Sequence, residues 1–152
     1  MVRARRFLTV ALLAAAACHG PEDPAADMVR SLARAASRRD AAAIVAALSP
    51  SFEGTLGMRR DDVASELARL FAAYASVDVS IADLTTERFP EFTVARFVAV
   101  FRGSVRRIGG LEGMLPSSAR YRFELRLAPD GRALRIATAR WEEIDRGGAR
   151  GD

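Results

Sequence analysis

The hydrophobic pattern of this 152-residue chain changes its period once, at Tyr74. Before Tyr74, apolar residues recur every three or four positions, as they do on one face of an amphipathic helix. After Tyr74, apolar and polar residues alternate, as they do along a half-buried β-strand. A helical half followed by a strand half predicts an α+β domain whose helices lie against an antiparallel sheet.

Three helices are expected in the first half of the chain. They run over 24–38, over 41–48, and from Asp61 or Asp62 to Tyr74, with a turn over 51–58 between the second and the third. The first helix places Val29, Leu32 and Ala33 on one face and turns Arg30 and Arg34 away from it. An apolar helix face has to be buried, so we expect the helices to pack on the sheet.

Four strands joined by hairpins are expected in the second half. They run over 77–82, 93–105, 120–127 and 133–144, and residues 129–131 form the last turn. The alternation slips at Asp83–Leu84, which predicts a β-bulge. Aromatic and apolar residues of the strands are expected to face the helices: Phe97, Phe101, Tyr121, Phe123 and Leu125 toward Leu32, Leu67, Leu70 and Phe71.

Arginines mark the opposite face of the predicted sheet. They are Arg120, Arg122 and Arg126 on one strand and Arg96 and Arg102 on the strand before it. Such a row could bind an anion, but it is also typical of a solvated sheet face whose charge is neutralised across strands. We expect Glu124, Glu142 and Glu143 to supply the neutralising carboxylates.

The N-terminal segment has the layout of a bacterial export signal. Three arginines within residues 3–6 precede the apolar run 7–17, which is too short to span a bilayer as a helix, since that takes about 20 residues. Small residues then lead into Cys18, the only cysteine of the chain. The segment resembles a lipoprotein signal, in which the cysteine is acylated and becomes the mature N-terminus. An ordinary cleaved signal that leaves a soluble periplasmic protein is the alternative.

The sequence predicts four segments once the export signal is set apart. We expect a signal peptide over 1–17, a tether over 18–23, a folded domain over 24–144 and a disordered tail over 145–152. His19 follows the cysteine where an acidic residue would favour retention at the inner membrane, so the outer membrane is the expected address. A single cysteine excludes a disulfide within the chain.

Net charge gives no reason to expect a nucleic-acid partner. Without residues 1–17, which hold three of the 23 arginines and no acid, the formal charge falls from +4 to +1. A charge that leaves with the signal cannot attract a polyanion. All basic residues are arginine, and Lys, Asn and Gln are absent, which indicates a GC-rich bacterial genome.

The order of elements resembles the nuclear transport factor 2-like superfamily, which includes ketosteroid isomerases and polyketide cyclases. The resemblance covers about residues 24–144. It is carried by the step Arg39-Asp40-Ala41 into a short helix, the passage Leu48-Ser49-Pro50 with Phe52 and Gly54, and a last strand ending in Trp141-Glu142. The resemblance implies a cone: three helices packed in a strongly curved antiparallel sheet of four or more strands.

The resemblance also implies an apolar pocket inside the cone. Its expected lining is Phe71, Tyr74, Phe97, Phe101, Tyr121 and Phe123. An apolar small molecule is the expected ligand, and a homodimer is a further expectation. No cofactor and no metal are expected, because one histidine and one cysteine cannot make a zinc site.

Enzymes of this superfamily place an Asp with a Tyr or a His in the cone. The single histidine, His19, lies in the tether. The weak candidates for acid–base catalysis are therefore Asp78 and Asp83, with Tyr74 and Tyr121 as hydrogen-bond donors. Asp78 alternates with apolar neighbours as a solvent-facing strand residue would, so the prediction favours no catalytic residue.

Two functional classes remain open from the sequence. The favoured one is a lipid-anchored envelope protein that binds a small apolar molecule or docks a protein. The alternative is an isomerase- or hydratase-like enzyme that uses an Asp of the cone. The apolar loop 103–119 between two strands could cover the mouth of the cone or pack on its own sheet.

The first prediction concerns Cys18, whose thiol would accept the acyl chain. We expect the wild-type protein to enter the detergent phase of a Triton X-114 partition. Cys18→Ala, which lacks the acceptor, should stay in the aqueous phase or remain unprocessed. Immunoblots of both phases measure the difference, and equal partitioning of the two proteins would contradict lipidation.

Overall fold

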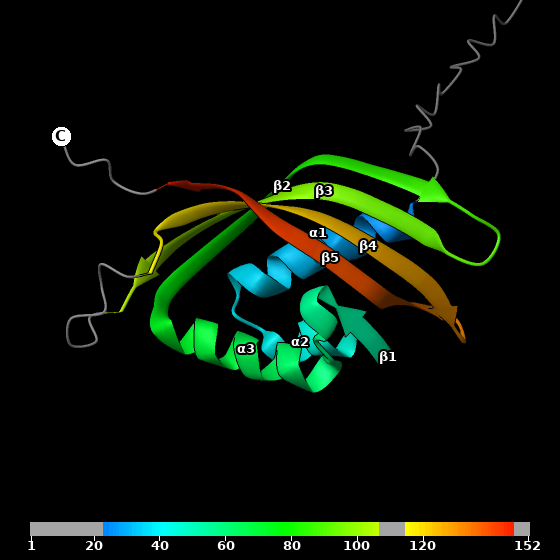
Figure 1. The fold of residues 1–152 in the computed structure, drawn as a ribbon, viewed down its shortest axis with the longest axis horizontal. Helices are drawn as coiled ribbons and strands as arrows, with labels where there is room; N and C mark the ends of the chain where they lie inside the picture. Colours follow the sequence, from blue (N-terminus) through cyan, green and yellow to red (C-terminus); the bar gives the residue numbers. More distant parts are fainter. Residues whose placement is uncertain (1–22, 107–114, 148–152) are drawn as a thin grey trace, which may run out of the picture.

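Helices and an antiparallel run of long strands occupy separate parts of the chain, interrupted only by a short strand before the third helix, which confirms the predicted α+β class. The computed structural model describes residues 23–106 and 115–147, with side chains up to Ile144. Its elements are α1 (Pro24–Ser37), α2 (Ala41–Ala46), β1 (Leu48–Gly54), the 3-10 turn η1 (Thr55–Gly57), α3 (Arg60–Ala73), β2 (Tyr74–Arg88), β3 (Thr93–Val105), β4 (Ser118–Asp130) and β5 (Ala133–Gly147). Figure 1 shows the long strands crossing over the helices.

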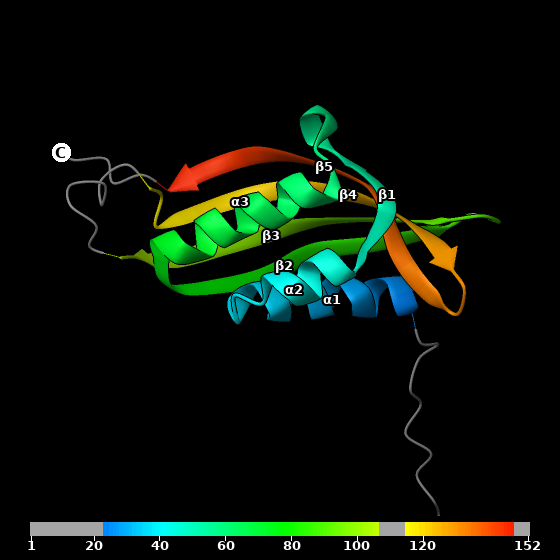
Figure 2. The same cartoon turned by 90° about the horizontal axis from the view of Figure 1, so that it is seen from below.

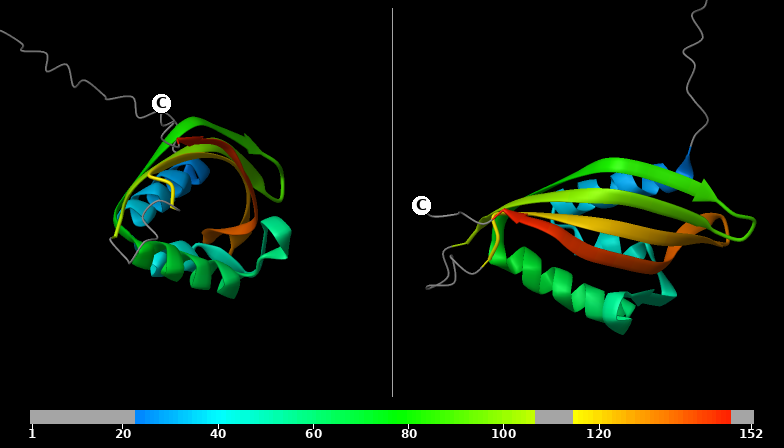
Figure 3. Two further views of the ribbon diagram at one scale, coloured as in Figure 1. Left: turned by 60° about the vertical axis from the view of Figure 1, so that its left-hand side comes forward. Right: turned by 45° about the horizontal axis from the view of Figure 1, so that its top comes forward.

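The five strands form one curled, unclosed sheet. Their order is β1-β5-β4-β3-β2, and every pair is antiparallel except β1 with β5, which is parallel. The helices all lie on one side of the sheet (Figure 2), and the end-on view of Figure 3 shows the sheet wrapping around them. The curl defines a concave face toward the helices and a convex face away from them.

Cross-strand register shows which residues share the concave face. Phe97 of β3 pairs with Phe123 of β4, which pairs with Trp141 of β5. Leu125, on the same side of β4 as Phe123, is buried with Phe97 in the main core cluster. The predicted inward orientation of these residues is therefore confirmed.

The predicted bulge is present in β2. Ala82 pairs with Val98 and Thr85 pairs with Arg96, so two residues of β2 stand opposite one residue of β3. Asp83, the first of the two, has a φ of 52°, in the left-handed region that Asp tolerates better than most residues. The bulge restores Leu84 to the concave side, where it packs on the core.

The turn predicted over 51–58 was wrong in its first half, which belongs to β1. β1 offers only Leu48 and Phe52 as buried residues, and Pro50 sits between them. A proline cannot donate a ladder hydrogen bond, and β1 tolerates it because it is an edge strand. The preceding helix accordingly ends at Ala46 rather than at residue 48, and β5 runs to Gly147, beyond the expected end at residue 144.

Two apolar clusters fill the space between helices and sheet. The larger cluster joins α1 and β1 to the first half of β3, the second half of β4 and the first half of β5. Its residues Val29, Phe52 and Leu127 are almost fully buried. The smaller joins α3 to the start of β2 through Phe71 and Tyr74, with Leu67 packed against it. Leu70 was predicted to belong to the core, but it is 39% exposed. Helix α3 instead packs the side that carries Leu67 and Phe71 against the sheet.

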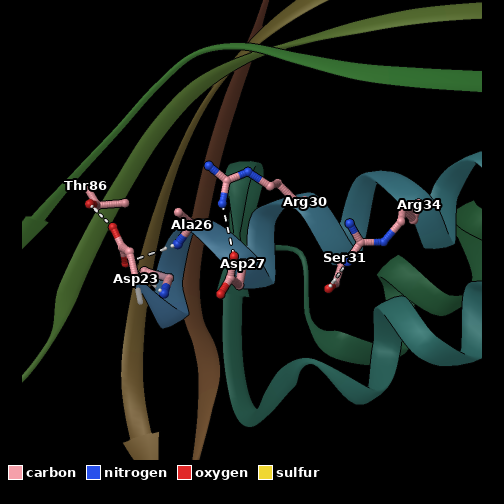
Figure 4. Close-up of polar contacts among 8 residues, drawn as sticks. Asp23, Ala26, Asp27, Arg30, Ser31, Arg34 and Thr86 are labelled. Carbon is pink, nitrogen blue, oxygen red and sulfur yellow. Dashed lines mark hydrogen bonds and ion pairs between the residues drawn. The ribbon is translucent and has the colours of Figure 1, made fainter. Parts of the chain in front are cut away.

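Helix α1 is fixed to the edge strand β2 at both of its ends. At its N-terminus the Asp23 carboxylate accepts hydrogen bonds from the backbone N–H groups of Ala25 and Ala26, at 3.0 and 3.2 Å. The same carboxylate accepts a 2.5 Å hydrogen bond from the Thr86 hydroxyl (Figure 4). Near the C-terminus of the helix, the Ser37 hydroxyl accepts a hydrogen bond from the Val79 N–H at 2.9 Å.

Within residues 23–106 and 115–147, none of the helices has the length and apolar character needed to cross a membrane.

The second prediction follows from Asp23. The hydrogen bond from Thr86 is the main cause that lowers the pKa of the Asp23 carboxyl below its ordinary value. A lowered pKa means that the carboxylate stabilises the fold above about pH 4, and that this contribution is lost as the pH falls through the folded-state pKa. Asp23→Asn keeps a good N-cap but cannot titrate.

We therefore expect the free energy of unfolding to fall less between pH 6 and pH 2.5 in Asp23→Asn than in wild type. Urea unfolding followed by circular dichroism at both pH values measures the two differences. Asp27→Asn is the matched control, because Asp27 makes only an exposed ion pair with Arg30. An identical pH dependence of wild type and Asp23→Asn would refute the assigned role.

Candidate functional site

Aromatic side chains of β3, β4 and β5 gather on the concave side of the sheet. The rings of Phe97 and Phe123 are stacked with centroids 5.3 Å apart, and the Phe123 and Trp141 rings are stacked at 6.1 Å. Tyr121 meets Phe123 edge-on at 6.5 Å. We call these four residues the aromatic face.

The aromatic face is only partly covered. Phe97 is buried, but Tyr121, Phe123 and Trp141 are each half-buried. Among the described residues, α1 makes its main contacts with α2, β2 and β3, whereas α3 makes its own with α2, β1 and β2. Neither helix is therefore mainly packed on β4 or β5, so three aromatic rings at the centre of a concave sheet keep accessible surface.

A second aromatic group surrounds the enclosed Tyr74, and we call it the enclosed group, with Phe101 as a partly buried member. The Tyr74 and Phe101 rings meet edge-on at 5.1 Å, and Tyr74 is 1% exposed. The Tyr74 hydroxyl donates a 2.8 Å hydrogen bond to the carbonyl of Pro116. The Tyr74 carbonyl accepts hydrogen bonds from the side chains of Arg39 and Arg106. Tyr74 is thus a structural junction between α3, β2 and the start of β4.

The six residues predicted to line a pocket are divided between these two groups. Phe71, Tyr74 and Phe101 belong to the enclosed group, and Phe97, Tyr121 and Phe123 belong to the aromatic face. A ligand pocket lined by all six stays a prediction. Trp141 was missed as a site residue. It lies two residues after Ala139 on the last strand, so alternation could have placed both residues on the concave side.

The two candidate aspartates lie away from both candidate tyrosines. Asp78 is exposed and pairs with Arg102, on the convex side of the sheet. Asp83 is exposed at the bulge of the edge strand β2. Tyr121 projects from the concave side of β4. The structure therefore does not bring an aspartate together with a tyrosine in the way that the enzyme hypothesis requires.

The convex face carries the arginine row, and two of the expected acids pair with it. Arg122 contacts Glu142 at 2.5 Å, and Arg96 contacts Glu124 at 2.8 Å. The hydrogen bond to Glu124, followed by that to Glu87, raises the pKa of Arg96 above its ordinary value. All of these side chains are about half exposed or more, so each pair contributes little to stability.

Glu143 was expected on the convex face with Glu142, and this was wrong. Glu143 pairs with Tyr121, two residues beyond Trp141 and on the same side of β5 as that residue. Its side chain is exposed. Neighbouring residues of a strand point to opposite sides, so Glu142 and Glu143 do not share the convex face.

A cleft of about 380 Å³ lies elsewhere, between α1 and the edge strand β2. It is lined by Arg30, Ala33, Ile81 and Leu84. The one charged group of this lining, Arg30, already pairs with Asp27 at 3.0 Å (Figure 4). The cleft offers no aromatic ring and no unpaired charge, so we regard the aromatic face as the better candidate site.

No three His, Cys, Asp or Glu side chains come together as a metal-binding group within the parts of the chain that the structure describes. Cys18 and His19 lie outside the described residues, as do residues 107–114 of the predicted loop over 103–119.

Known protein structures reproduce this arrangement of helices and curled sheet. A nuclear transport factor 2-like superfamily protein of Salmonella enterica superposes with a TM-score of 0.63 and 14% identity, over 83% of this chain and 92% of its own. The chain has the nuclear transport factor 2-like fold. A candidate scytalone dehydratase of Novosphingobium aromaticivorans is similar too, with a TM-score of 0.71 and 7% identity, over 85% of this chain and 87% of its own.

The fold also occurs within a longer protein. Bd1075 of Bdellovibrio bacteriovorus matches 79% of this chain with a TM-score of 0.65 and 11% identity, and the match spans only 40% of Bd1075. No protein-family model and no curated protein sequence matches the chain. At these identities the likeness concerns the fold alone.

The third prediction uses the close approach of Tyr74 to Gly103. A Cβ atom at residue 103 would lie 2.6 Å from the Tyr74 ring, too near for two carbon atoms. Because Tyr74 is enclosed and hydrogen-bonded, its ring cannot easily move away. We expect Gly103→Ala to lower the free energy of unfolding by about 1–3 kcal/mol, the usual cost of overpacking.

Urea unfolding measures this loss, with Ser104→Ala as the control. Ser104 is the exposed neighbour of Gly103, so its truncation should change the free energy by less than about 0.5 kcal/mol. A Gly103→Ala variant as stable as wild type would mean that the Tyr74 ring is loosely held.

Proposed function

We propose that this protein is a non-catalytic binding protein of the bacterial cell envelope, whose aromatic face holds an apolar small molecule. An acyl chain on Cys18 anchors it, in the outer membrane rather than the inner one. The anchor is supported by the N-terminal sequence, and the binding activity by the geometry of the concave face. A homodimer remains compatible with this function, and no nucleic acid takes part.

The observation that carries the proposal is the partly exposed aromatic face inside a curled sheet. Folding normally buries aromatic rings, because removing about 100 Å² of apolar surface from water contributes roughly 2.5 kcal/mol. Tyr121, Phe123 and Trp141 leave part of this free energy unused. A flat apolar ligand that covers these rings would recover it, and stacking on aromatic rings would orient the ligand.

The described residues support binding rather than acid–base catalysis. A strong base at neutral pH needs a carboxylate whose pKa is raised by burial, or a histidine. No polar or charged side chain is buried within residues 23–106 and 115–144. The carboxylate nearest to the aromatic face in sequence and register, Glu143, is exposed.

An enzyme of the dehydratase or isomerase type is the second candidate. Its support is the fold that the chain shares with the candidate scytalone dehydratase. Because one fold hosts many functions, a shared fold is a weaker argument than the residues of the site. The enzyme would have to use groups other than Asp78 and Asp83, since both are exposed and neither lies beside Tyr121.

The fourth prediction tests binding with N-phenyl-1-naphthylamine, an uncharged apolar probe that fluoresces when it leaves water. Trp141 is the only tryptophan of the chain and belongs to the aromatic face, so it can transfer energy to a bound probe. We expect saturable probe fluorescence on excitation of Trp141. Tyr121→Ala, which removes one half-buried ring, should weaken the affinity about fivefold or more.

Phe89→Ala is the matched control for this experiment. Phe89 is 37% exposed and stacks on Phe92 in the turn between β2 and β3, where Phe92 lies under Arg126 of the convex face rather than beside the aromatic face. Its removal should leave the affinity unchanged. Absence of saturable binding to the wild-type protein, or equal losses in the two variants, would refute the aromatic face as a binding site.

A further inference from the structure

The turn between β2 and β3 carries two aromatic rings outside the core. Phe89 and Phe92 stack with their centroids 4.7 Å apart, and the Phe89 N–H closes the turn by donating a 2.8 Å hydrogen bond to the Phe92 carbonyl. Phe89 is 37% exposed, and Phe92 is half-buried. Within the described residues, neither ring is a member of the two apolar clusters that fill the domain. The pair therefore presents apolar surface at this end of the sheet.

The turn lies at the end of the domain where the first helix begins. Figure 2 shows the start of α1 and the β2–β3 turn at the same end, opposite the junction of α3 and β2. The 2.5 Å hydrogen bond from the Thr86 hydroxyl to the Asp23 carboxylate fixes this proximity. Phe89 follows Thr86 by three residues, so β2 carries it about 10 Å beyond that contact.

The expected anchor is separated from the domain by a short segment. Five residue steps lead from Cys18 to Asp23, and they span at most about 18 Å when fully extended. An acyl chain on Cys18 would therefore hold Asp23 within that distance of the bilayer surface. Because the turn projects past Asp23, its two rings can reach the headgroup layer while the domain stays folded.

The side chains around the two rings match a phospholipid surface. At such a surface, Phe side chains lie at the boundary of headgroups and acyl chains, and arginines keep their charge among the headgroups. The guanidinium carbon of Arg126 lies 3.7 Å from the centroid of the Phe92 ring, and Arg88 is exposed next to Phe89. Glu91 is exposed in the turn. Charges of both signs suit zwitterionic headgroups, which offer a phosphate to arginine and an ammonium group to glutamate.

Two further carboxylates at this end already have partners. Glu87 pairs with Arg96 at 3.3 Å, and Asp130 pairs with Arg135 at 3.5 Å. They therefore add little repulsion toward lipid phosphates. A protein could also cover two phenylalanines, but the reach of the tether favours the membrane, which is present wherever the anchored domain is.

We propose that the β2–β3 turn docks the domain on the membrane that holds its acyl anchor, with Phe89 and Phe92 inserted among zwitterionic phospholipid headgroups. The inference rests on the proposed function, since it requires the acyl chain on Cys18. It goes beyond anchoring, because an acyl chain alone leaves the domain free to tumble at the end of its tether. A second attachment at the same end fixes the orientation of the domain to the bilayer.

The test places a fluorophore in the turn of the acylated protein. Acylation occupies Cys18, so Glu91→Cys supplies the only free thiol, which takes an NBD label. The labelled protein is purified from membranes and reconstituted into vesicles of phosphatidylethanolamine and phosphatidylcholine, and flotation measures its attachment. Part of the phosphatidylcholine carries a doxyl quencher on its acyl chain, close to the headgroup. This quencher acts only at short range, so it reports contact of the label with lipid.

We expect the label at residue 91 to be quenched about threefold more than a label introduced by Ala72→Cys. Ala72 is exposed on α3, two residues before Tyr74, and thus lies at the opposite end of the domain. Equal quenching at the two positions in protein that floats with the vesicles would overturn the docking and leave the anchor intact. A protein partner that covers the turn would give the same result.

Phe89→Ala and Leu70→Ala are a matched pair of variants. Each removes an apolar side chain of similar exposure, 37% for Phe89 and 39% for Leu70, and Leu70 lies on α3 near the opposite end. In protein labelled at residue 91, Phe89→Ala should reduce the quenching about threefold, and Leu70→Ala should leave it unchanged. Unchanged binding of N-phenyl-1-naphthylamine shows that the Phe89 variant is folded.

The outcomes separate this inference from the proposed function. Equal quenching in Phe89→Ala and wild type would overturn the docking, because contact with lipid would not depend on the exposed ring. Equal losses in Phe89→Ala and Leu70→Ala would also overturn it. Protein that does not float with the vesicles lacks the anchor, and this result would refute the envelope function together with the docking.

Discussion

The enclosure of Tyr74 is the interaction on which the rest of the fold depends. The chain passes from α3 into β2 at this residue without a loop. The ring lies against Phe101 and Gly103, the hydroxyl reaches the start of β4 through Pro116, and the carbonyl receives Arg39 and Arg106. One residue thereby fixes the helical half of the chain to the strand half. The direction in which β2 leaves α3 sets how the sheet curls around the helices.

The curl produces two faces of different character. On the convex side, charged residues of neighbouring strands pair with one another, as Arg122 does with Glu142. These exposed pairs keep the sheet soluble and add little stability. On the concave side, α1 and α3 pack mainly toward β1, β2 and β3. The apolar side of β4 and β5 thus lies beyond the main helix contacts, and this asymmetry creates the aromatic face.

Most of the fold follows from local periodicity, and the exceptions have physical causes. β3 was predicted with its observed bounds, because β-branched and aromatic residues recur along all of its thirteen positions. β1 was missed, because it has two buried residues, a proline and a partner, β5, that is remote in sequence. Glu143 was assigned to the wrong face, although neighbouring strand residues point to opposite sides, so that alternation from Trp141 already separates Glu143 from Glu142. The aromatic strand residues were predictable, whereas the incomplete cover by helices, which makes them a candidate site, depends on tertiary packing.

The attachment of α1 to the edge strand has a mechanical consequence. If the chain is held from its N-terminal side, tension enters the domain at Asp23, where the carboxylate caps α1 and receives the Thr86 hydroxyl. This load is carried by β2, at one edge of the sheet, whereas β5 and its aromatic residues lie toward the opposite edge. A pull strong enough to detach α1 would strip the helix from β2 before it strained β4 and β5. The domain thus separates the point that bears force from the surface that we propose as a binding site.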